Sequence, residues 1–366
     1  MPMRNTPAPD DGDFAGLADR LRGELLRPGD EGYDAARTIW NSMVDRKPIA
    51  IARCAGTADV IAAVDFCRDH DFPLSVKSGG HHVSGKAICD NGLVIDLSPM
   101  TGIRVDPTAR RARVQPGATW GDIDHETQQF GLAVPGGQDP NIGVSGLTLG
   151  GGVGWLSAKY GLTSDNLLSA DVVTAEGELV TASEETHPDL FWALRGGGGN
   201  FGIVTSFEFK LYEVGPEILA GSLIYPLEEM IEVARHYRAF MAEAPNEVRL
   251  LFGLMELPAA SYYPESVHDT RVAMLIAFYA GDPEDGRRVL APLRELGDPL
   301  MDSIRPRSYV GYQRAGDSGG SMRTYLRSQY LAELTDAAIE TIAEFGIEAP
   351  SSGSTVFVSP RHGAET

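Results

Sequence analysis

A histidine that follows two glycines is the strongest chemical signal in this sequence. The segment Ser75–Gly85 reads SVKSGGHHVSG. Glycine has no side chain, so a backbone that turns at Gly79 and Gly80 can come close to a flat or charged ligand. The imidazole of His81 would then lie at the point of closest approach, whereas the ring of His82 would point elsewhere from the same loop.

Two further glycine clusters follow, Gly143–Gly154 and Gly196–Gly202. The first can be interpreted as a close-packed helix or as a backbone surface whose amide groups bind a diphosphate. The second can be a flexible loop, but its apolar flanks FWAL and FGIV look packed, which favours a tight backbone cradle. Three such clusters together predict a large cofactor held mainly by main chain.

Two nucleotide-binding motifs are matched only in part. Residues 80–87 fit the pattern GxxxxGK[ST] except at Ala87, which lacks the hydroxyl group that a magnesium ion needs. Gly197, Gly199 and Gly202 fit GxGxxG, but a short predicted helix precedes them and a strand follows. A dinucleotide site has the opposite order, so this match is interpreted as chance.

The composition argues against several classes of partner. The chain has 366 residues, of which 43% are hydrophobic, enough for two domains with a sizeable core. The formal net charge of −20 argues against nucleic acid and against an anionic membrane. The three cysteines have no metal-ligand spacing, so no metal site is predicted. No signal peptide or membrane span is recognisable, which makes the cytoplasm the default compartment. The oligomeric state stays open.

Hydrophobic periodicity predicts the elements that position the glycine clusters. Helices are expected over residues 14–26, 33–40, 57–70 with Thr57 as cap, 119–129 and 188–194. Strands are expected over residues 74–77, 93–97 and 203–211, with hairpins over 103–115 and 172–181.

The character of the chain changes at residues 214–216, where the glycine clusters stop. Strands are expected beyond this point over residues 218–225, 248–256, 272–279 and 354–359, with helices ending near 242 and covering 285–296 and 335–345. This pattern is typical of an antiparallel sheet covered by helices on one face. We therefore expect a domain boundary near Gly215.

Six motifs follow one another between residues 46 and 216. They are KSGGH at 77–81, GLVIDL at 92–97, GLAVPG at 131–136, GVSGL at 143–147, KYGLTSDN at 159–166 and DLFWALRGGGGNFG at 189–202. In this order they resemble the FAD-linked oxidoreductases with the PCMH-type flavin fold, specifically the berberine bridge enzyme-like group. The resemblance implies an α+β fold with an N-terminal helical segment over 1–45, a two-part PCMH-type FAD-binding domain over 46–215 and an α+β substrate domain over 216–366.

The resemblance implies FAD as cofactor, with a covalent bond from the ring of His81 to the 8α-methyl group of the flavin. Family members often add a second bond from a cysteine, but Asp139 stands at that position, so one link is expected. Val144 resembles the oxygen-permissive type of gating residue. The residues expected to bind the flavin are Lys77, Ser78, Gly79, Gly80, His81, Ser84, Pro135, Gly136, Gly143, Val144, Gly146, Thr148, Gly151, Gly154, Trp155, Asp165, Asn166, Gly202, Ile203 and Val204.

The implied reaction is hydride transfer from a small alcohol, sugar or related substrate to flavin N5, with oxygen or another acceptor reoxidising the flavin. This chemistry needs a general base, which the family usually supplies from its last quarter. No base is assigned here, and Tyr309, Tyr312 and Tyr325 stay open as candidates.

The C-terminal part of the substrate domain resembles the middle of the family's domain and then stops. The substrate domain is therefore expected to be incomplete, with a last strand over 354–359 that has nothing to pair with. The alternative hypothesis is a flavin-binding protein without a complete catalytic site.

Overall fold

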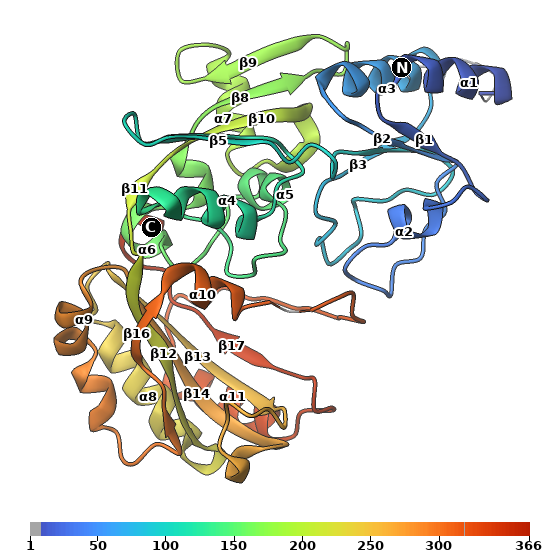
Figure 1. The fold of residues 1–366 in the computed structure, drawn as a ribbon. Coiled ribbons are helices and arrows are strands. Elements are labelled where there is room, and N and C mark those ends of the chain that lie inside the picture. Colours follow the sequence, from blue (N-terminus) through green and yellow to red (C-terminus); the bar gives the residue numbers. More distant parts are fainter. Residues whose placement is uncertain (1–8, 318) are drawn as a thin grey trace. The chain divides into compact units, whose positions relative to one another are not determined.

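The computed structural model describes residues 9–317 and 319–366, so the first eight residues of the polar start lie outside it. The chain forms two compact units (Figure 1). Unit 1 comprises Met1–Gly154, Leu162–Glu213 and Gln313–Arg327, and unit 2 comprises Trp155–Gly161, Val214–Tyr312 and Ser328–Thr366. Because the units consist of interleaved segments, a domain division near Gly215 remains a prediction.

The first sheet of unit 1 has the strand order β1-β2-β4-β3. Its strands are β1 (Glu24–Leu26), β2 (Ala50–Arg53), β3 (Leu74–Lys77) and β4 (Leu93–Asp96). β2 and β3 both run parallel to β4, whose four residues are all buried. Parallel strands are usually covered on both faces, which explains the continuous apolar run. The helices α1 (Asp11–Arg20) and α3 (Thr57–Asp69) form one hydrophobic core with this sheet. The helix α2 (Tyr33–Arg37) forms a second core with it.

The second sheet of unit 1 is antiparallel, with the order β5-β6-β10-β8-β9. Its strands are β5 (Ile103–Asp106), β6 (Arg111–Val114), β8 (Leu167–Val173), β9 (Leu179–Ser183) and β10 (Ile203–Lys210). The helices α4 (Trp120–Thr127), α5 (Val144–Leu149) and α7 (Pro188–Leu194) contribute to the same core as these strands. Two short strands, β7 (Leu132–Ala133) and β11 (Tyr212–Glu213), pair beside them.

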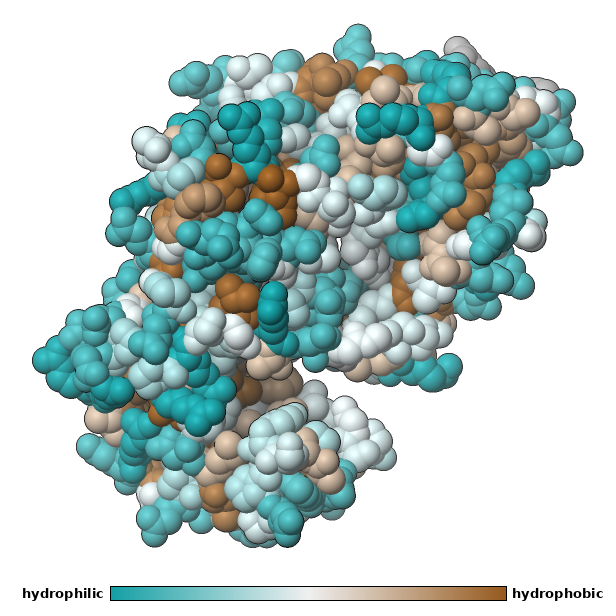
Figure 2. Space-filling view, in the orientation of Figure 1, coloured by the Kyte–Doolittle hydropathy of each residue, from teal (hydrophilic) through white to brown (hydrophobic). Residues whose placement is uncertain are grey.

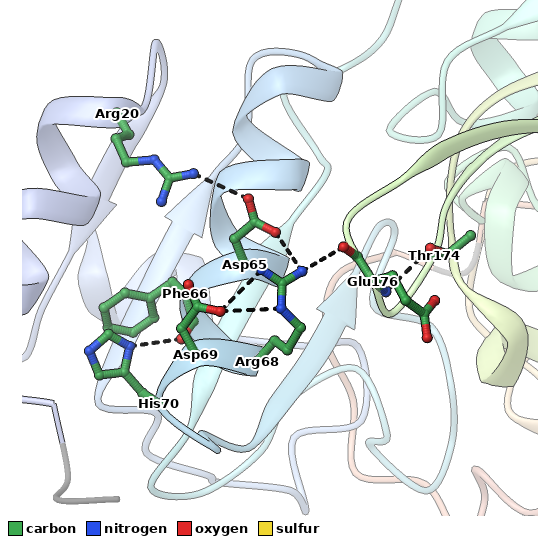
Figure 3. A network of polar contacts seen from close by, with 8 residues as sticks. All are labelled: Arg20, Asp65, Phe66, Arg68, Asp69, His70, Thr174 and Glu176. Carbon is green, nitrogen blue, oxygen red and sulfur yellow. Dashed lines mark hydrogen bonds and ion pairs between the residues drawn. The ribbon is translucent and has the colours of Figure 1, made fainter.

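A polar network ties α1 and α3 to the turn between β8 and β9 (Figure 3). The Arg68 guanidinium donates to the Glu176 carbonyl oxygen at 2.5 Å and pairs with Asp65 at 2.8 Å and Asp69 at 3.1 Å. Asp65 also pairs with Arg20 at 3.3 Å. These contacts link the two sheets of unit 1 through their peripheral elements.

Unit 2 contains an antiparallel sheet with the order β15-β12-β14-β13-β17, and β16 also pairs with β12. Its strands are β12 (Glu217–Pro226), β13 (Val248–Leu257), β14 (Thr270–Tyr279), β15 (Met301–Asp302), β16 (Arg305–Ser308) and β17 (Val356–Val358). The helices are α6 (Ser157–Tyr160), α8 (Met230–Met241), α9 (Pro283–Val289) and α11 (Asp336–Ile347), and α10 (Tyr309–Arg314) continues into unit 1. Alternate residues of β14 join α8 and α11 in one core.

The expected α+β class with an antiparallel second sheet is therefore confirmed. Figure 2 shows a mostly hydrophilic face with scattered apolar patches, in keeping with the net charge of −20. Within the described ranges, no helix is long and apolar enough to cross a membrane. The same ranges contain no cluster of three or more side chains able to hold a metal ion.

The N-terminal helix predictions were too long. Instead of one helix over residues 14–26, α1 ends at Arg20 and β1 follows. The cause is tertiary: β1 pairs with β2, and the Asp59 carboxylate accepts hydrogen bonds from the amides of Arg22 and Gly23. The second predicted helix, over 33–40, ends at Arg37.

Two further expectations were wrong. Thr57 does not cap α3, because the N-cap is Gly56 and no side chain bonds the first amides there. The last strand does have a partner: β17 pairs antiparallel with β13 from Phe252 to Leu254. Periodicity also missed β15, β16 and α10, which are too short to give a repeating pattern.

Candidate functional site

The loop after β3 begins with a lysine that points inward. The Lys77 ammonium donates to the Ala36 carbonyl oxygen at 2.5 Å and lies 4.0 Å from the buried Asp96 carboxylate. Burial lowers the pKa of Lys77, and the charge of Asp96 opposes this effect. The Lys77 side chain therefore anchors the start of the loop to α2 and β4.

The next residues press against a second loop, backbone to backbone. A Cβ atom built on Gly79 would lie 2.5 Å from the nitrogen of Gly143, and one built on Gly143 would lie 2.6 Å from the nitrogen of Gly79. No side chain fits at either position. The Ser78 and Ser145 hydroxyls both donate to the Pro116 carbonyl oxygen, at 2.6 and 2.7 Å, which fixes both loops to a common point.

Five consecutive amide groups in this loop have no acceptor. Among residues 9–317 and 319–366, nothing accepts a hydrogen bond from the backbone N–H groups of residues 79–83. Gly80 has φ +67°, a conformation that favours glycine. Unused amides next to a residue with positive φ can bind an anionic group.

His81 lies in this loop, half-buried, with its ring stacked on Trp40 at 5.8 Å between centroids and 20° between planes. Burial lowers the pKa of His81 below its ordinary value of 6.5, and the charge of Asp139 acts in the opposite direction. The ring is therefore neutral at neutral pH. His82 points elsewhere, as expected: its Nδ1 lies 3.1 Å from the Ser84 amide and 2.9 Å from the Ser84 hydroxyl.

The predicted glycines at 136–154 divide into two groups. A Cβ atom on Gly154 would lie 1.7 Å from the Gly136 carbonyl oxygen, and one on Gly136 would lie 2.3 Å from the Trp120 ring. Glycine is required at both positions because neighbouring chain segments occupy the space of a side chain. A Cβ atom on Gly146 would meet nothing within 4 Å, so this position faces open space.

The sequence of the segment 143–154 can be interpreted either as a close-packed helix or as a backbone surface for a diphosphate. The segment contains both the helix α5 and an irregular run that follows it. Val144 begins α5, is fully buried and donates its amide to the Ala118 carbonyl oxygen at 2.9 Å. The Thr148 hydroxyl is buried and has no protein partner among the described residues. Pro135 is buried, and Gly151 has φ +103°.

Asp165 and Asn166 shape a turn with their side chains. The Asp165 carboxylate accepts from the Leu162 amide at 2.8 Å, and the Asn166 amide group donates to the Leu162 carbonyl oxygen at 2.8 Å. The Asn166 side-chain oxygen also accepts from the Tyr212 hydroxyl at 2.8 Å. A ligand could therefore bind Asp165 and Asn166 through their backbone groups, or through the hydrogen-bonding positions of their side chains that these contacts leave unused.

The third glycine cluster departs from expectation. Phe191 and Leu194 are buried, but Trp192 is 74% exposed and Phe201 is 44% exposed, so the packed flanks predicted there are only half correct. Beyond this loop, Gly202 is tightly enclosed, since a Cβ atom there would lie 2.5 Å from the Val172 side chain. Ile203 and Val204 follow it as buried residues of β10.

Several remaining candidates belong to unit 2. Trp155 stacks there on Phe278 at 5.7 Å and lies 5.3 Å from the ring of Tyr312. Burial raises the pKa of Tyr312, so its hydroxyl keeps its proton at neutral pH. Tyr309 is also buried in unit 2, whereas Tyr325 in unit 1 is 74% exposed.

Comparison with known proteins identifies the family. The family described as FAD binding domain matches residues 48–183. The (R)-6-hydroxynicotine oxidase of Paenarthrobacter nicotinovorans is 35% identical over 349 residues, covering 92% of this chain and 73% of that protein. This chain belongs to the FAD-linked oxidoreductases.

Solved structures of relatives agree with this family. Xylooligosaccharide oxidase from Myceliophthora thermophila has a TM-score of 0.80 at 26% identity, covering 96% of this chain and 76% of that one. The berberine bridge enzyme-like protein 1 of Physcomitrella patens has a TM-score of 0.82 at 20% identity, covering 96% of this chain and 78% of that one, and supports the fold alone. The protein is thus an FAD-dependent oxidoreductase, and its fold is that of the berberine bridge enzyme-like protein.

The geometry of unit 1 fits FAD. Over residues 9–317 and 319–366, the amides of residues 79–83 and the Thr148 hydroxyl have no protein partner. These amides suit a diphosphate, and the open space at Gly146 can receive a flat ring. Sequence reasoning missed Trp40, whose ring lies against His81 and whose buried indole N–H has no partner among the described residues. A lone tryptophan in a predicted helix gave no signal that could have identified this role.

The pKa of His81 can be measured by NMR titration of flavin-free protein, with the signal assigned by its loss in His81→Gln. We expect a value below 6.5, since burial disfavours the charged ring. The Asp139→Asn substitution should lower it further, because it removes a charge that favours protonation. The contribution of His81 to the free energy of unfolding is complete above the pKa that this histidine has in the unfolded chain. It is lost as the pH falls through the lower pKa of the folded protein. A His81 pKa at or above 6.5 would contradict this environment, and His82→Gln serves as control.

Proposed function

We propose that unit 1 binds FAD against the amides of residues 79–83 and carries it on a single covalent bond to His81. The enzyme then oxidises a small alcohol, sugar or related molecule, and oxygen or another acceptor reoxidises the flavin. The observation that carries the proposal is a neutral, stacked histidine beside five unused amide donors in one loop. The expected single link follows from the carboxylate at Asp139, which cannot form a thioether.

The loop would act on the cofactor in two ways. The amides of Gly79 and Gly80 and their neighbours would donate to the diphosphate oxygens, which places the pyrophosphate without a charged side chain. The His81 ring, held by Trp40, would direct a nitrogen lone pair at the 8α-carbon of the flavin. This N–C bond would replace one N–H bond of the ring and one C–H bond of the methyl group, and oxygen would take up the two electrons and two protons released, as hydrogen peroxide.

When bound, FAD supplies an acceptor at N5 for a hydride from a substrate C–H bond. The substrate must also lose a proton, and the residue that takes it stays open. Tyr312 has a raised pKa and therefore keeps its own proton, so it is suited to donating a hydrogen bond rather than to acting as a base. The substrate class is inferred from relatives named as oxidases of hydroxynicotine and xylooligosaccharides.

Acid precipitation tests the covalent link. Denatured wild-type protein should retain yellow flavin in the pellet, because a covalent bond survives unfolding. His81→Ala should release all of its flavin into the supernatant, while the matched variant His82→Ala should retain it, since the His82 ring is directed to Ser84. Pellet-bound flavin in His81→Ala would show that another residue carries the link.

The substitution Gly146→Ala tests where the cofactor lies. In the flavin-free protein it should stabilise α5 by up to about 1 kcal/mol, because alanine is the better helix former and its methyl group meets no atom within 4 Å. The same methyl group should weaken retention of non-covalent FAD in a His81→Ala background. Thermal unfolding and equilibrium dialysis measure the two effects. Unchanged FAD affinity would contradict a flavin surface at this position.

Anaerobic reduction tests the reaction. A substrate should bleach the visible flavin band of the wild-type protein, and admission of air should restore it with release of hydrogen peroxide. The panel should contain glucose, xylobiose, simple alcohols and 6-hydroxynicotine, with dithionite as a positive control for reducible flavin. Full reduction by dithionite, with no bleaching by any organic compound, would instead favour a flavin-binding protein without this catalytic activity.

A further inference from the structure

Residues 313–327, which we call the strap, lie far along the chain but belong to unit 1. In Figure 1 the strap comprises the end of α10 and the orange segment that follows this helix. Its first residue, Gln313, is 2% exposed and donates to the Asp124 carboxylate at 2.8 Å and to the Gly137 carbonyl oxygen at 3.1 Å. The Asn141 side chain donates to the Asp317 carboxylate at 2.6 Å. The strap is therefore fixed near the segment that contains Asp139.

The far end of the strap is bonded to the residues beside His81. The Met322 amide donates to the Trp40 carbonyl oxygen at 2.8 Å, and the Ser42 amide donates to the Met322 carbonyl oxygen at 2.9 Å. These bonds form a parallel bridge between Asn41 and Met322. Trp40 in turn donates its amide to the Gly80 carbonyl oxygen at 3.2 Å and stacks its ring on His81.

Asn41 connects the strap and the histidine loop through one buried side chain, which is 4% exposed. Its amide nitrogen donates to the Val83 carbonyl oxygen at 2.7 Å and to the Thr324 carbonyl oxygen at 3.1 Å. Its oxygen accepts from the amides of Met43 at 3.1 Å and Thr324 at 3.3 Å. Two donors and two acceptor positions exhaust the capacity of an asparagine side chain.

We propose that Asn41 is a positioning residue for flavin attachment: it fastens the strap to Val83 and so holds the His81 loop in its reactive conformation. Together, Trp40 and Asn41 contact residues 80, 81 and 83 on one side and residues 322 and 324 on the other. The inference rests on the proposed covalent link at His81.

The physical reason is the cost of ordering the loop. The amides of residues 79–83 bond to none of the described residues, so no backbone ladder within this part of the chain fixes their conformation. Fixing one residue costs about 1–2 kcal/mol of conformational entropy, and attachment at His81 needs the whole turn ordered before the bond forms. The bonds to the carbonyl oxygens of Gly80 and Val83 hold the loop from outside while its donors stay available.

The test compares Asn41→Ala and Asn41→Asp with the control Thr127→Val. The aspartate keeps both acceptor positions but removes the donors to Val83 and Thr324, and it remains available if the alanine variant does not fold. Thr127 is a buried residue of unit 1 whose hydroxyl donates to the Ile123 carbonyl oxygen at 2.8 Å within α4. Its loss should affect stability without affecting the His81 loop.

The readout is the ratio of acid-stable flavin to total bound flavin, which a uniform loss of folded protein does not alter. We expect the Asn41 variants to attach flavin at least fivefold more slowly than the wild type in a time course, and Thr127→Val to match the wild type. Equal attachment rates in the Asn41 variants and in Thr127→Val would overturn the inference while leaving the link at His81 intact.

A second readout does not depend on attachment. In flavin-free protein the His81 ring proton signal, assigned with His81→Gln, should carry a ring-current shift from Trp40 that the Asn41 variants lose. If wild-type pellets contain no flavin, the proposed link fails, and this signal alone then decides whether Asn41 positions the histidine. An unchanged His81 signal in both Asn41 variants would overturn the inference.

Discussion

The close approach of two backbones at Gly79 and Gly143 is the constraint on which the candidate site depends. Each glycine occupies the space that a Cβ atom on the other would need. The contact joins the loop after β3, from the first sheet of unit 1, to the start of α5, which packs in the core of the second sheet. The two halves of unit 1 thus meet through main chain, and the amides beyond Gly79 stay available for a ligand.

Around this contact, side chains mostly hold the protein itself. Lys77 reaches α2, Asp165 and Asn166 stabilise their own turn, and Ser84 contacts His82. Within the part of the chain that the structure describes, the groups left for a cofactor are mainly backbone amides, one histidine and the Thr148 hydroxyl, which has no hydrogen-bond partner there. The six family motifs therefore describe, in large part, the internal scaffold of the site rather than its contact surface.

The sequence predicted the regular elements well where a repeat was long enough to read. β3 and α7 have the predicted bounds, and most of the other predicted strands differ by only a few residues at their ends. The failures have tertiary causes: pairing with β2 ended the first helix early, and β17 found a partner in β13 that no local pattern indicates. For the candidate site, composition and spacing predicted a role for His81, whereas the contacts of Trp40 and Asn41 with residues 80–83 and 322–324 could be found only in the fold.

The interleaving of the two units affects how the protein can be divided. The chain passes between them after residues 154, 161, 213, 312 and 327. A fragment cut at residue 215 would lose Gln313 and with it a buried partner of Asp124, and it would retain residues 155–161 without the sheet of unit 2. Exchange of unit 2 between relatives would therefore have to preserve several splice points at once, and an amino-terminal fragment of unit 1 would lack residues 313–327.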